Sequence, residues 1–158
     1  MRVGVISDTH LRGYDEGLKR IVDEHFRDAD LIVHAGDLVD IRVLDVFGTK
    51  EVKAVWGNMD PPSVRRALPA SITMQISGFT VGVAHGWGPP TGLEERLLRL
   101  FGPIHCLIFG HSHEPVNCVR NGVLLFNPGS AVDGRFSSRN SMGILEISDT
   151  IEGGIITL

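Results

Sequence analysis

The sequence of 158 residues has few cysteines and no long apolar segment. Its two cysteines, Cys106 and Cys118, suit a reducing cytosol better than a disulfide scaffold. No apolar run approaches the roughly 20 residues that a membrane-spanning helix requires. The first predicted strand begins at Arg2, which leaves no room for a signal peptide. We therefore expect a cytoplasmic protein that is not anchored in a membrane.

The sequence also lacks an excess of basic residues. Lys and Arg number 15 against 19 Asp and Glu, which gives a net charge of -4 with the His residues neutral. Binding to nucleic acid through bulk electrostatics is therefore not favoured, although cleavage of a nucleotide at a locally positive site stays open. There is no internal repeat, linker or low-complexity tract. The length and the 42% of hydrophobic residues suit one domain over residues 1–158.

Strand and helix patterns alternate up to about residue 110, which is typical of βαβ units with a parallel sheet. The strands predicted there are Arg2–Ser7, Leu31–Ala35, Val52–Trp56, Phe79–Ala84 and Cys106–Phe109. One helix is expected before Leu31 and another over Leu93–Phe101, with Thr91 and Glu94 spaced as a capping box. Asp60–Pro69 is expected to be a surface loop with a short helical turn.

From Val116 onward the pattern changes to short strands separated by Asn-Gly, Asp-Gly and Gly-Gly turns. The predicted strands are Val116–Val119, Val123–Phe126, Met142–Ile147 and Gly154–Leu158. We expect them to form a second sheet, mixed or antiparallel. Two sheets that face each other with helices outside would make a four-layer α-β-β-α sandwich, so the expected fold class is α/β.

Seven side chains of metal-binding type occur in five short clusters, each where a predicted strand runs out into a turn that contains glycine. They are Asp8, His10, Asp37, Asn58, His85, His111 and His113. Core residues at these positions would be apolar, so polar side chains at five strand ends favour one site at a shared crevice. Asp37 is the expected bridging ligand, because a carboxylate has two oxygens and can bind two cations.

Each cluster taken alone also has an ordinary structural explanation. Asp8 and His10 could be a turn aspartate and a solvated histidine, and an asparagine after glycine, such as Asn58, is a common turn residue. A single histidine at a strand end is more often structural than a ligand. The remaining histidines lack the turn context and are interpreted as packing or surface residues: His25, His34 and His105. The metal hypothesis therefore depends on the complete set.

The order Asp-x-His, Gly-Asp, Gly-Asn, His-Gly, Gly-His-x-His resembles the calcineurin-like metallophosphoesterase superfamily, and within it the small single-domain phosphodiesterases of bacteria and archaea. The resemblance covers nearly the whole sequence and includes Asn127-Pro128-Gly129-Ser130. It implies the sandwich fold and two metal ions. One ion would be held by Asp8, His10, Asp37 and His113, and the other by Asp37, Asn58, His85 and His111. Catalytic roles are assigned to Asp37, Asn58 and His85.

Two departures from the family pattern bear on activity. Many relatives have a histidine after Gly-Asn that protonates the leaving group, whereas this sequence has Met59, and a thioether cannot donate a proton. Hydrolysis of esters with poor leaving groups is therefore expected to be slow. Relatives keep an acid at Asp60, which would either hold a ligand histidine or be a solvated loop residue. The Gly-Asp motif continues into Asp40-Ile41-Arg42 rather than Asp-Arg-Gly, which disfavours the protein phosphatase branch.

The charge of the expected centre suits phosphoester chemistry. Two divalent cations together with Asp8 and Asp37 leave about +2, which attracts phosphate. A bridging water would lose a proton near neutral pH and attack phosphorus in line. We therefore expect a binuclear metal-dependent phosphodiesterase that acts on a small or exposed phosphodiester. The mixed ligands favour Mn²⁺, with Ni²⁺, Fe²⁺, Co²⁺ or Zn²⁺ as alternatives, over Ca²⁺ or Mg²⁺.

Two other functions stay open from the sequence. One retromer subunit resembles this fold and serves as an interaction module, so a non-catalytic scaffold with a retained metal site is one alternative. A phosphomonoesterase is the other, although a dianionic monoester usually needs extra Arg or His donors. Substrate choice is expected to depend on the loops Trp87–Pro90 and Asp133–Arg139. The tail strand and apolar residues such as Trp87 would be compatible with a homo-oligomer.

Overall fold

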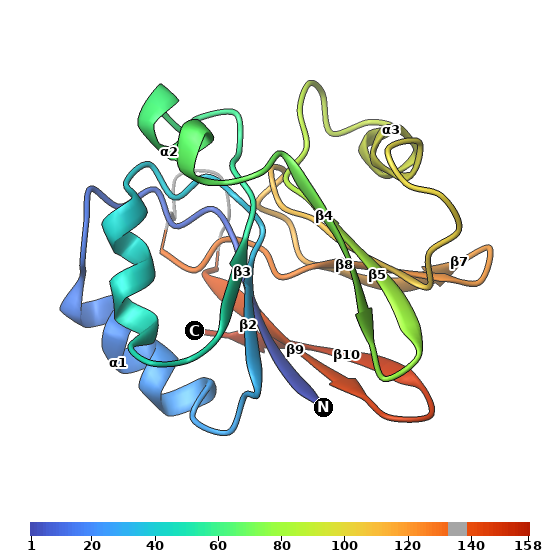
Figure 1. The fold of residues 1–158 in the computed structure, drawn as a ribbon, viewed down its shortest axis with the longest axis horizontal. Helices are drawn as coiled ribbons and strands as arrows, with labels where there is room; N and C mark the ends of the chain where they lie inside the picture. The colour runs from blue at the N-terminus through green and yellow to red at the C-terminus, as the bar shows by residue number, and fades with distance from the viewer. Residues whose placement is uncertain (133–138) are drawn as a thin grey trace.

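The computed structural model of the chain describes residues 1–132 and 139–158, and it contains two five-stranded sheets that pack against each other (Figure 1). The strands of the first sheet are β1 (Arg2–Ile6), β2 (Leu31–His34), β3 (Val52–Ala54), β9 (Ser141–Ile147) and β10 (Ile151–Thr157). Those of the second sheet are β4 (Ser71–Ile76), β5 (Phe79–Ala84), β6 (Cys106–Ile108), β7 (Val116–Arg120) and β8 (Val123–Asn127). The strand orders are β10-β9-β1-β2-β3 and β4-β5-β6-β8-β7.

Both sheets are mixed. In the first, β1, β2 and β3 are parallel, and the hairpin of β9 and β10 joins β1 in the antiparallel sense. In the second, β5, β6 and β8 are parallel, with β4 and β7 antiparallel at the edges. The expectation that the strands after Val116 form a sheet of their own was therefore wrong. Each sheet combines early and late strands, because β7–β8 and β9–β10 are hairpins that add to different parallel cores.

Strand β4 and the 3-10 helix η1 (Ile41–Phe47) were not predicted. Along β4 the side chains alternate between exposed and half-buried until the buried Ile76, as befits an edge strand with polar residues on its outer face. Its partner β5 follows directly after the turn at Ser77 and Gly78, where both residues have positive φ. The β4–β5 hairpin was therefore not predicted, because the hydrophobic pattern of β4 is weak.

Helices α1 and α3 cover the outer faces of the first and second sheets, respectively. Helix α1 (Glu16–His25) begins at Asp15, whose Oδ1 accepts a hydrogen bond from the backbone N–H of Leu18 at 2.8 Å. Helix α2 (Pro62–Ala67) is the predicted short helical turn. Helix α3 (Leu93–Leu98) follows Gly92, which is left-handed, and no side chain caps it. The predicted capping box was therefore wrong, because the chain enters α3 through a glycine.

Three apolar clusters correspond to the three contacts between layers. Inward-facing residues of the two sheets, such as Val5 and Phe126, pack on each other, since alternate strand residues point to opposite faces. On the other face of the first sheet, Ile32 packs with residues of α1 and η1. On the other face of the second, Leu107 packs with Leu97 of α3. These contacts confirm the α-β-β-α sandwich. Among the described residues, no helix has the length and apolar character needed to cross a membrane.

Candidate metal centre

All of the predicted metal-binding side chains lie at one end of the sandwich, where loops from both sheets meet. Asp8 and His10 follow β1, Asp37 follows β2, Asn58 follows β3, His85 follows β5, and His111 and His113 follow β6. Two groups of three have ligand atoms within 4.8 Å of one another: Asp8, His10 and His113, and Asp8, Asp37 and His85. The strand ends thus converge as expected, although the strands belong to two sheets rather than one.

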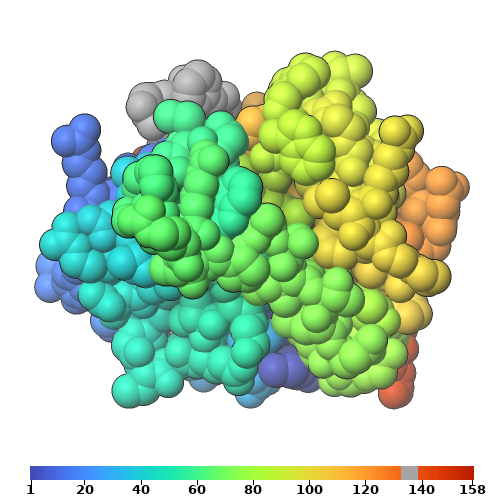
Figure 2. All heavy atoms as spheres, turned by 45° about the horizontal axis from the view of Figure 1, so that its top comes forward, coloured from blue at the N-terminus to red at the C-terminus, as the bar shows by residue number. Residues whose placement is uncertain are grey.

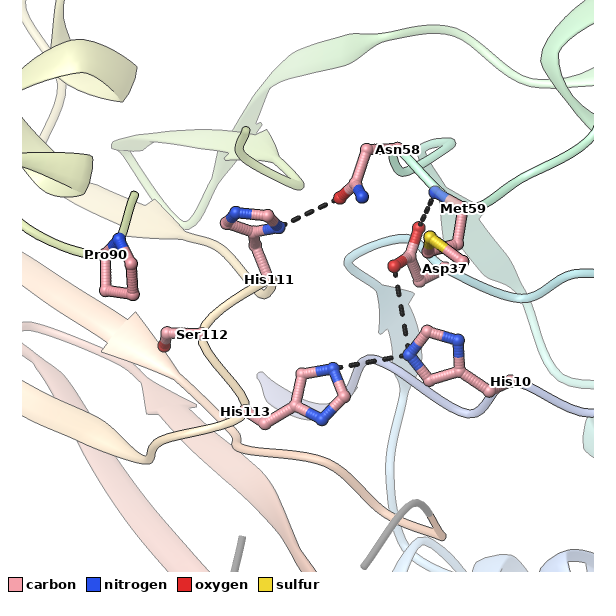
Figure 3. A pocket seen from close by; sticks show the side chains of 8 residues that line it. All are labelled: His10, Asp37, Asn58, Met59, Pro90, His111, Ser112 and His113. Atoms are coloured by element: carbon pink, nitrogen blue, oxygen red, sulfur yellow. Dashed lines mark hydrogen bonds and ion pairs between the residues drawn. The ribbon is translucent and has the colours of Figure 1, made fainter. Parts of the chain in front are cut away.

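The first half of the centre contains two imidazoles that face a buried carboxylate. The Nε2 atoms of His10 and His113 are 3.3 Å apart (Figure 3). His113 Nε2 lies 3.2 Å from Asp8 Oδ1, and His10 Nε2 lies 3.8 Å from the same oxygen. Asp8 is fully buried. These three ligand atoms could therefore share one cation.

The second half is arranged around the amide of Asn58. Its Oδ1 lies 2.9 Å from Nδ1 of His111, as Figure 3 shows, and 3.1 Å from Nε2 of His85. His85 Nε2 is also 3.3 Å from Oδ2 of Asp37. Asp37 Oδ2 is in turn 3.8 Å from His10 Nε2, so this oxygen lies between the two halves.

Backbone carbonyls orient two of the imidazoles. His85 Nδ1 lies 2.7 Å from the oxygen of Ala35, and His111 Nε2 lies 2.7 Å from the oxygen of Gly88. In each case a proton on that nitrogen leaves the other ring nitrogen with a lone pair directed toward Asn58. The two rings thus present the nitrogens that a cation requires.

The electrostatics of the centre also fit a cation. Burial alone would lower the pKa of His85, but its hydrogen bond with Asp37 and the charges of Asp8 and Asp37 raise that pKa to about 9. Burial alone would raise the pKa of Asp8, yet His113 and His85 hold it below its ordinary value. Asp8 Oδ1 faces imidazole nitrogens, with His113 Nε2 at 3.2 Å and His85 Nε2 at 3.8 Å. Buried negative charge that attracts protons in this way would also attract a metal ion.

Five of the seven candidate ligands have positive φ angles, a left-handed backbone conformation that residues other than glycine rarely adopt. The φ angles are 52° at Asp8, 49° at His10, 57° at Asp37, 74° at His111 and 58° at His113. Such residues cost about 1–3 kcal/mol each and cluster at functional sites. The strain indicates that the loops are held for a purpose other than stability.

Two motif glycines make room for carboxylates from other motifs. A Cβ on Gly57 would lie 2.2 Å from Oδ1 of Asp37, and a Cβ on Gly110 would lie 2.7 Å from Oδ2 of Asp8. Any larger residue would displace a candidate ligand. The glycine of Gly-Asn and that of Gly-His-x-His are therefore part of the centre's geometry.

Asp60 has a different role from the one expected. Its Oδ2 accepts hydrogen bonds from the backbone N–H groups of Asp37 at 3.1 Å and Gly57 at 2.7 Å, and its Oδ1 accepts one from Val39 at 2.5 Å. The predictions that it holds a ligand histidine or is solvated were both wrong, because this buried carboxylate ties the loop after β2 to the loop after β3. Burial raises its pKa.

His34, which we predicted to be a packing or surface residue, holds two of the turns that carry candidate ligands. It is fully buried, its Nδ1 accepts a hydrogen bond from the N–H of Gly36 at 3.2 Å, and its Nε2 lies 3.1 Å from Oγ1 of Thr9. Burial lowers its pKa to about 3, so the ring stays neutral. It links the turn that carries Asp8 to the turn that carries Asp37.

The Asn127–Ser130 segment braces the remaining loops. Asn127 Nδ2 donates to the oxygen of Gly110 at 3.0 Å, next to His111, and Ser130 Oγ donates to the oxygen of Asp8 at 2.8 Å. The motif is visible in the sequence, but this role is not, since the contacts join residues far apart along the chain.

A cavity of about 370 Å³ opens over the centre (Figure 3). It is lined by His10, Asp37, Asn58, Met59, Pro90, His111, Ser112 and His113. Met59 is 61% exposed at its rim, beside Asn58. Pro90 belongs to the predicted substrate loop Trp87–Pro90, whereas residues 133–138 of the other predicted loop lie outside the described part of the chain.

Buried carboxylates and imidazoles at the loop end of two stacked sheets define a metallophosphoesterase-like α/β sandwich. The chain belongs to the calcineurin-like phosphoesterase superfamily, whose domain pattern matches residues 1–150. It is 35% identical to a probable metallophosphoesterase of Methanocaldococcus jannaschii, over 100% of this chain and 82% of that protein.

Two solved structures share the fold. One, described as a novel archaeal phosphodiesterase, superposes with a TM-score of 0.80 at 26% identity and covers 100% of both chains. The other is Vps29 of Entamoeba histolytica, with a TM-score of 0.75 at 23% identity over 100% of this chain and 99% of that one. The second likeness concerns the fold alone.

Proposed function

We propose that the protein is a phosphodiesterase that uses two divalent cations to hydrolyse a small or exposed phosphodiester. The observation that supports this most is the convergence of two carboxylates, four imidazoles and one amide at one end of the sandwich, where five of these seven side chains line a single cavity. Similarity to an archaeal phosphodiesterase over the full chain adds to it.

The proposed ligand sets divide the centre into two halves that share Asp37. Asp8, His10, Asp37 and His113 would hold one cation, and Asp37, Asn58, His85 and His111 the other. Asp37 Oδ1 already accepts a hydrogen bond from the N–H of Met59 at 2.8 Å. Bridging would therefore use Oδ2, the oxygen that faces both His10 and His85.

When bound, two cations would supply positive charge for the phosphate oxygens and lower the pKa of a water molecule. We propose Mn²⁺ as the first candidate, because imidazole, amide and carboxylate donors together suit first-row transition metals. The protein's part is to fix the donors. Asp60 and His34 hold the backbone of the loops, while Ala35 and Gly88 fix the rings of His85 and His111.

The rim of the cavity bears on which esters are hydrolysed. Met59 occupies the position where many relatives have a histidine, and its thioether cannot protonate a departing alcohol. Rapid turnover is therefore proposed for esters whose alcohol leaves without a proton.

A comparison of two p-nitrophenyl esters tests this proposal. Bis-p-nitrophenyl phosphate and p-nitrophenyl phosphate have the same leaving group, but the first is a diester and the second a monoester. We expect kcat/KM with Mn²⁺ to be at least about tenfold higher for the diester, because a dianionic monoester requires further cationic donors. A higher value for the monoester would contradict the assignment as a diesterase.

A further inference from the structure

A second cavity, of about 160 Å³, adjoins the metal centre at His85. We call it the tryptophan cavity. It is lined by Trp56, Ala70, Ser71, Ala84, His85, Gly86, Trp87 and Leu100. His85 Nε2 is 3.3 Å from Asp37 Oδ2, so one imidazole borders both the cavity and the metal centre. Trp56 also lies two residues before Asn58. A group held in this cavity would therefore lie across the ring of His85 from the metal centre.

The walls of the tryptophan cavity are aromatic and apolar. Trp87 is 46% exposed and Leu100 is 49% exposed, while Trp56 is half-buried with the guanidinium of Arg65 4.8 Å from its ring centroid. Single exposed apolar residues are ordinary, but several that share one concavity beside a polar centre are typical of a ligand site. In Figure 2 the segments around α2 and around residues 86–92 stand on opposite sides of a hollow.

The loop that carries Trp87 is fixed in place. Arg96 of α3 donates hydrogen bonds to the oxygens of Thr91 at 2.8 Å and Trp87 at 3.0 Å, and also to that of Pro89. On its other side the loop meets the centre through Gly88 and His111. A ligand would thus find the Trp87 wall already positioned, which lowers the cost of binding.

We propose that the tryptophan cavity binds the retained ester group of the substrate, and that this group is the base of a nucleoside. The inference rests on the proposed phosphodiesterase activity. Indole rings stack on nucleobases without strong preference for sequence, and the hydroxyl of Ser71 supplies a polar partner at the same wall. Water would add its hydroxyl to phosphorus and its second proton would go to the departing alcohol, which leaves a nucleoside monophosphate.

Two diesters with the same leaving group test this inference: thymidine 5′-p-nitrophenyl phosphate and methyl p-nitrophenyl phosphate, each with Mn²⁺. We expect the native protein to have a KM at least about fivefold lower for the thymidine ester, the lower limit for stacking of one base. Trp87→Ala should raise the KM of the thymidine ester by about 5- to 100-fold, and several times more than it raises the KM of the methyl ester. Trp87→Phe, which keeps an aromatic ring, should restore most of the difference.

Tyr14→Ala is the matched control, since Tyr14 is 48% exposed and lines neither cavity. Equal KM values for the two esters, or a Trp87→Ala effect of the same size on both, would overturn the subsite while the diesterase activity stands. No turnover of either ester would overturn the proposed function and this inference with it.

Discussion

At the scale of single residues, Asp37 joins the two halves of the centre. Its Oδ2 faces His10 and His85, and its Oδ1 is engaged by Met59. We predict that Asp37→Asn, which removes the charge but keeps the shape, abolishes binding of both cations and lowers activity by at least about 10²-fold. Metal content after dialysis and hydrolysis of bis-p-nitrophenyl phosphate are the measurements.

Asp40→Asn is the control for that variant, because Asp40 pairs with the exposed Arg42 on the surface. An Asp37→Asn protein that still turned over with added Mn²⁺ would contradict the bridging role.

Met59 accounts for a second prediction. Its side chain lines the cavity beside Asn58, so a histidine there would face a substrate bound in the cavity. We predict that Met59→His raises kcat for esters with poor leaving groups by about 10²-fold, the lower range for general acid catalysis, and hardly changes esters of p-nitrophenol. A steady-state comparison of alkyl and aryl diesters measures this. An equal change for both classes would mean that the new imidazole acts otherwise than as an acid.

His85 gives the metal-free protein a pH dependence. Its pKa is raised from 6.5 to about 9 by Asp37 and Asp8 against the effect of burial. A raised pKa in the folded state means that protonation stabilises folding fully below about pH 6.5, and that this contribution is lost as the pH rises through about 9. We predict that the Tm of chelator-treated protein falls over this interval.

The same measurement on His85→Gln serves as the comparison, and its Tm should fall less over that interval. If the Tm of the native protein and that of His85→Gln fell equally over this pH interval, the stabilising proton would not be bound to His85.

At the scale of elements, helix α3 acts on the centre through the loop before it. Arg96 holds the oxygens of Trp87, Pro89 and Thr91, and Gly88 between them meets His111. We predict that Arg96→Gln weakens the affinity for Mn²⁺ by about tenfold, because partners that orient a ligand typically contribute 10- to 100-fold. Calorimetric titration measures the affinity. Arg99→Gln, on the exposed end of the same helix, should bind as the native protein does.

The sequence predicted elements well where the apolar signal was continuous. Strands β1, β2, β5 and β6 have buried runs, and their predicted bounds differ from the observed ones by at most one residue. The signal failed for β4, an edge strand with alternating exposure, and for η1. It also could not assign strands to sheets, since pairing such as that of β1 with β9 joins residues as far apart in sequence as Arg2 and Glu146.

The candidate metal ligands could be predicted from the sequence, whereas the residues that hold their loops in place could not. Metal-type side chains at strand ends can be read in order, and the structure brings all seven together. The roles of Asp60 and His34 could not be read, because a carboxylate that binds backbone N–H groups and an imidazole that links two turns look like ordinary loop and strand residues. The left-handed backbone of the ligands likewise depends on the assembled loops.

At the scale of the whole molecule, the centre lies at the junction of two sheets. Asp8, Asp37 and Asn58 come from loops of the first sheet, and His85, His111 and His113 from loops of the second. The packing of the sheets through residues such as Val5 and Phe126 therefore sets the distances between ligands. Similarity to relatives over the full length is consistent with a fold and centre that form one unit.

We propose that the centre at this junction hydrolyses phosphodiesters with bound metal ions. The most direct measurement is hydrolysis of bis-p-nitrophenyl phosphate by chelator-stripped protein, before and after Mn²⁺ is restored. This diester is suitable because p-nitrophenolate leaves without a proton, and Met59 cannot donate one. We predict negligible turnover without metal and a rise of at least about 10²-fold with it. No turnover with Mn²⁺, Ni²⁺, Co²⁺ or Zn²⁺ would contradict the claim.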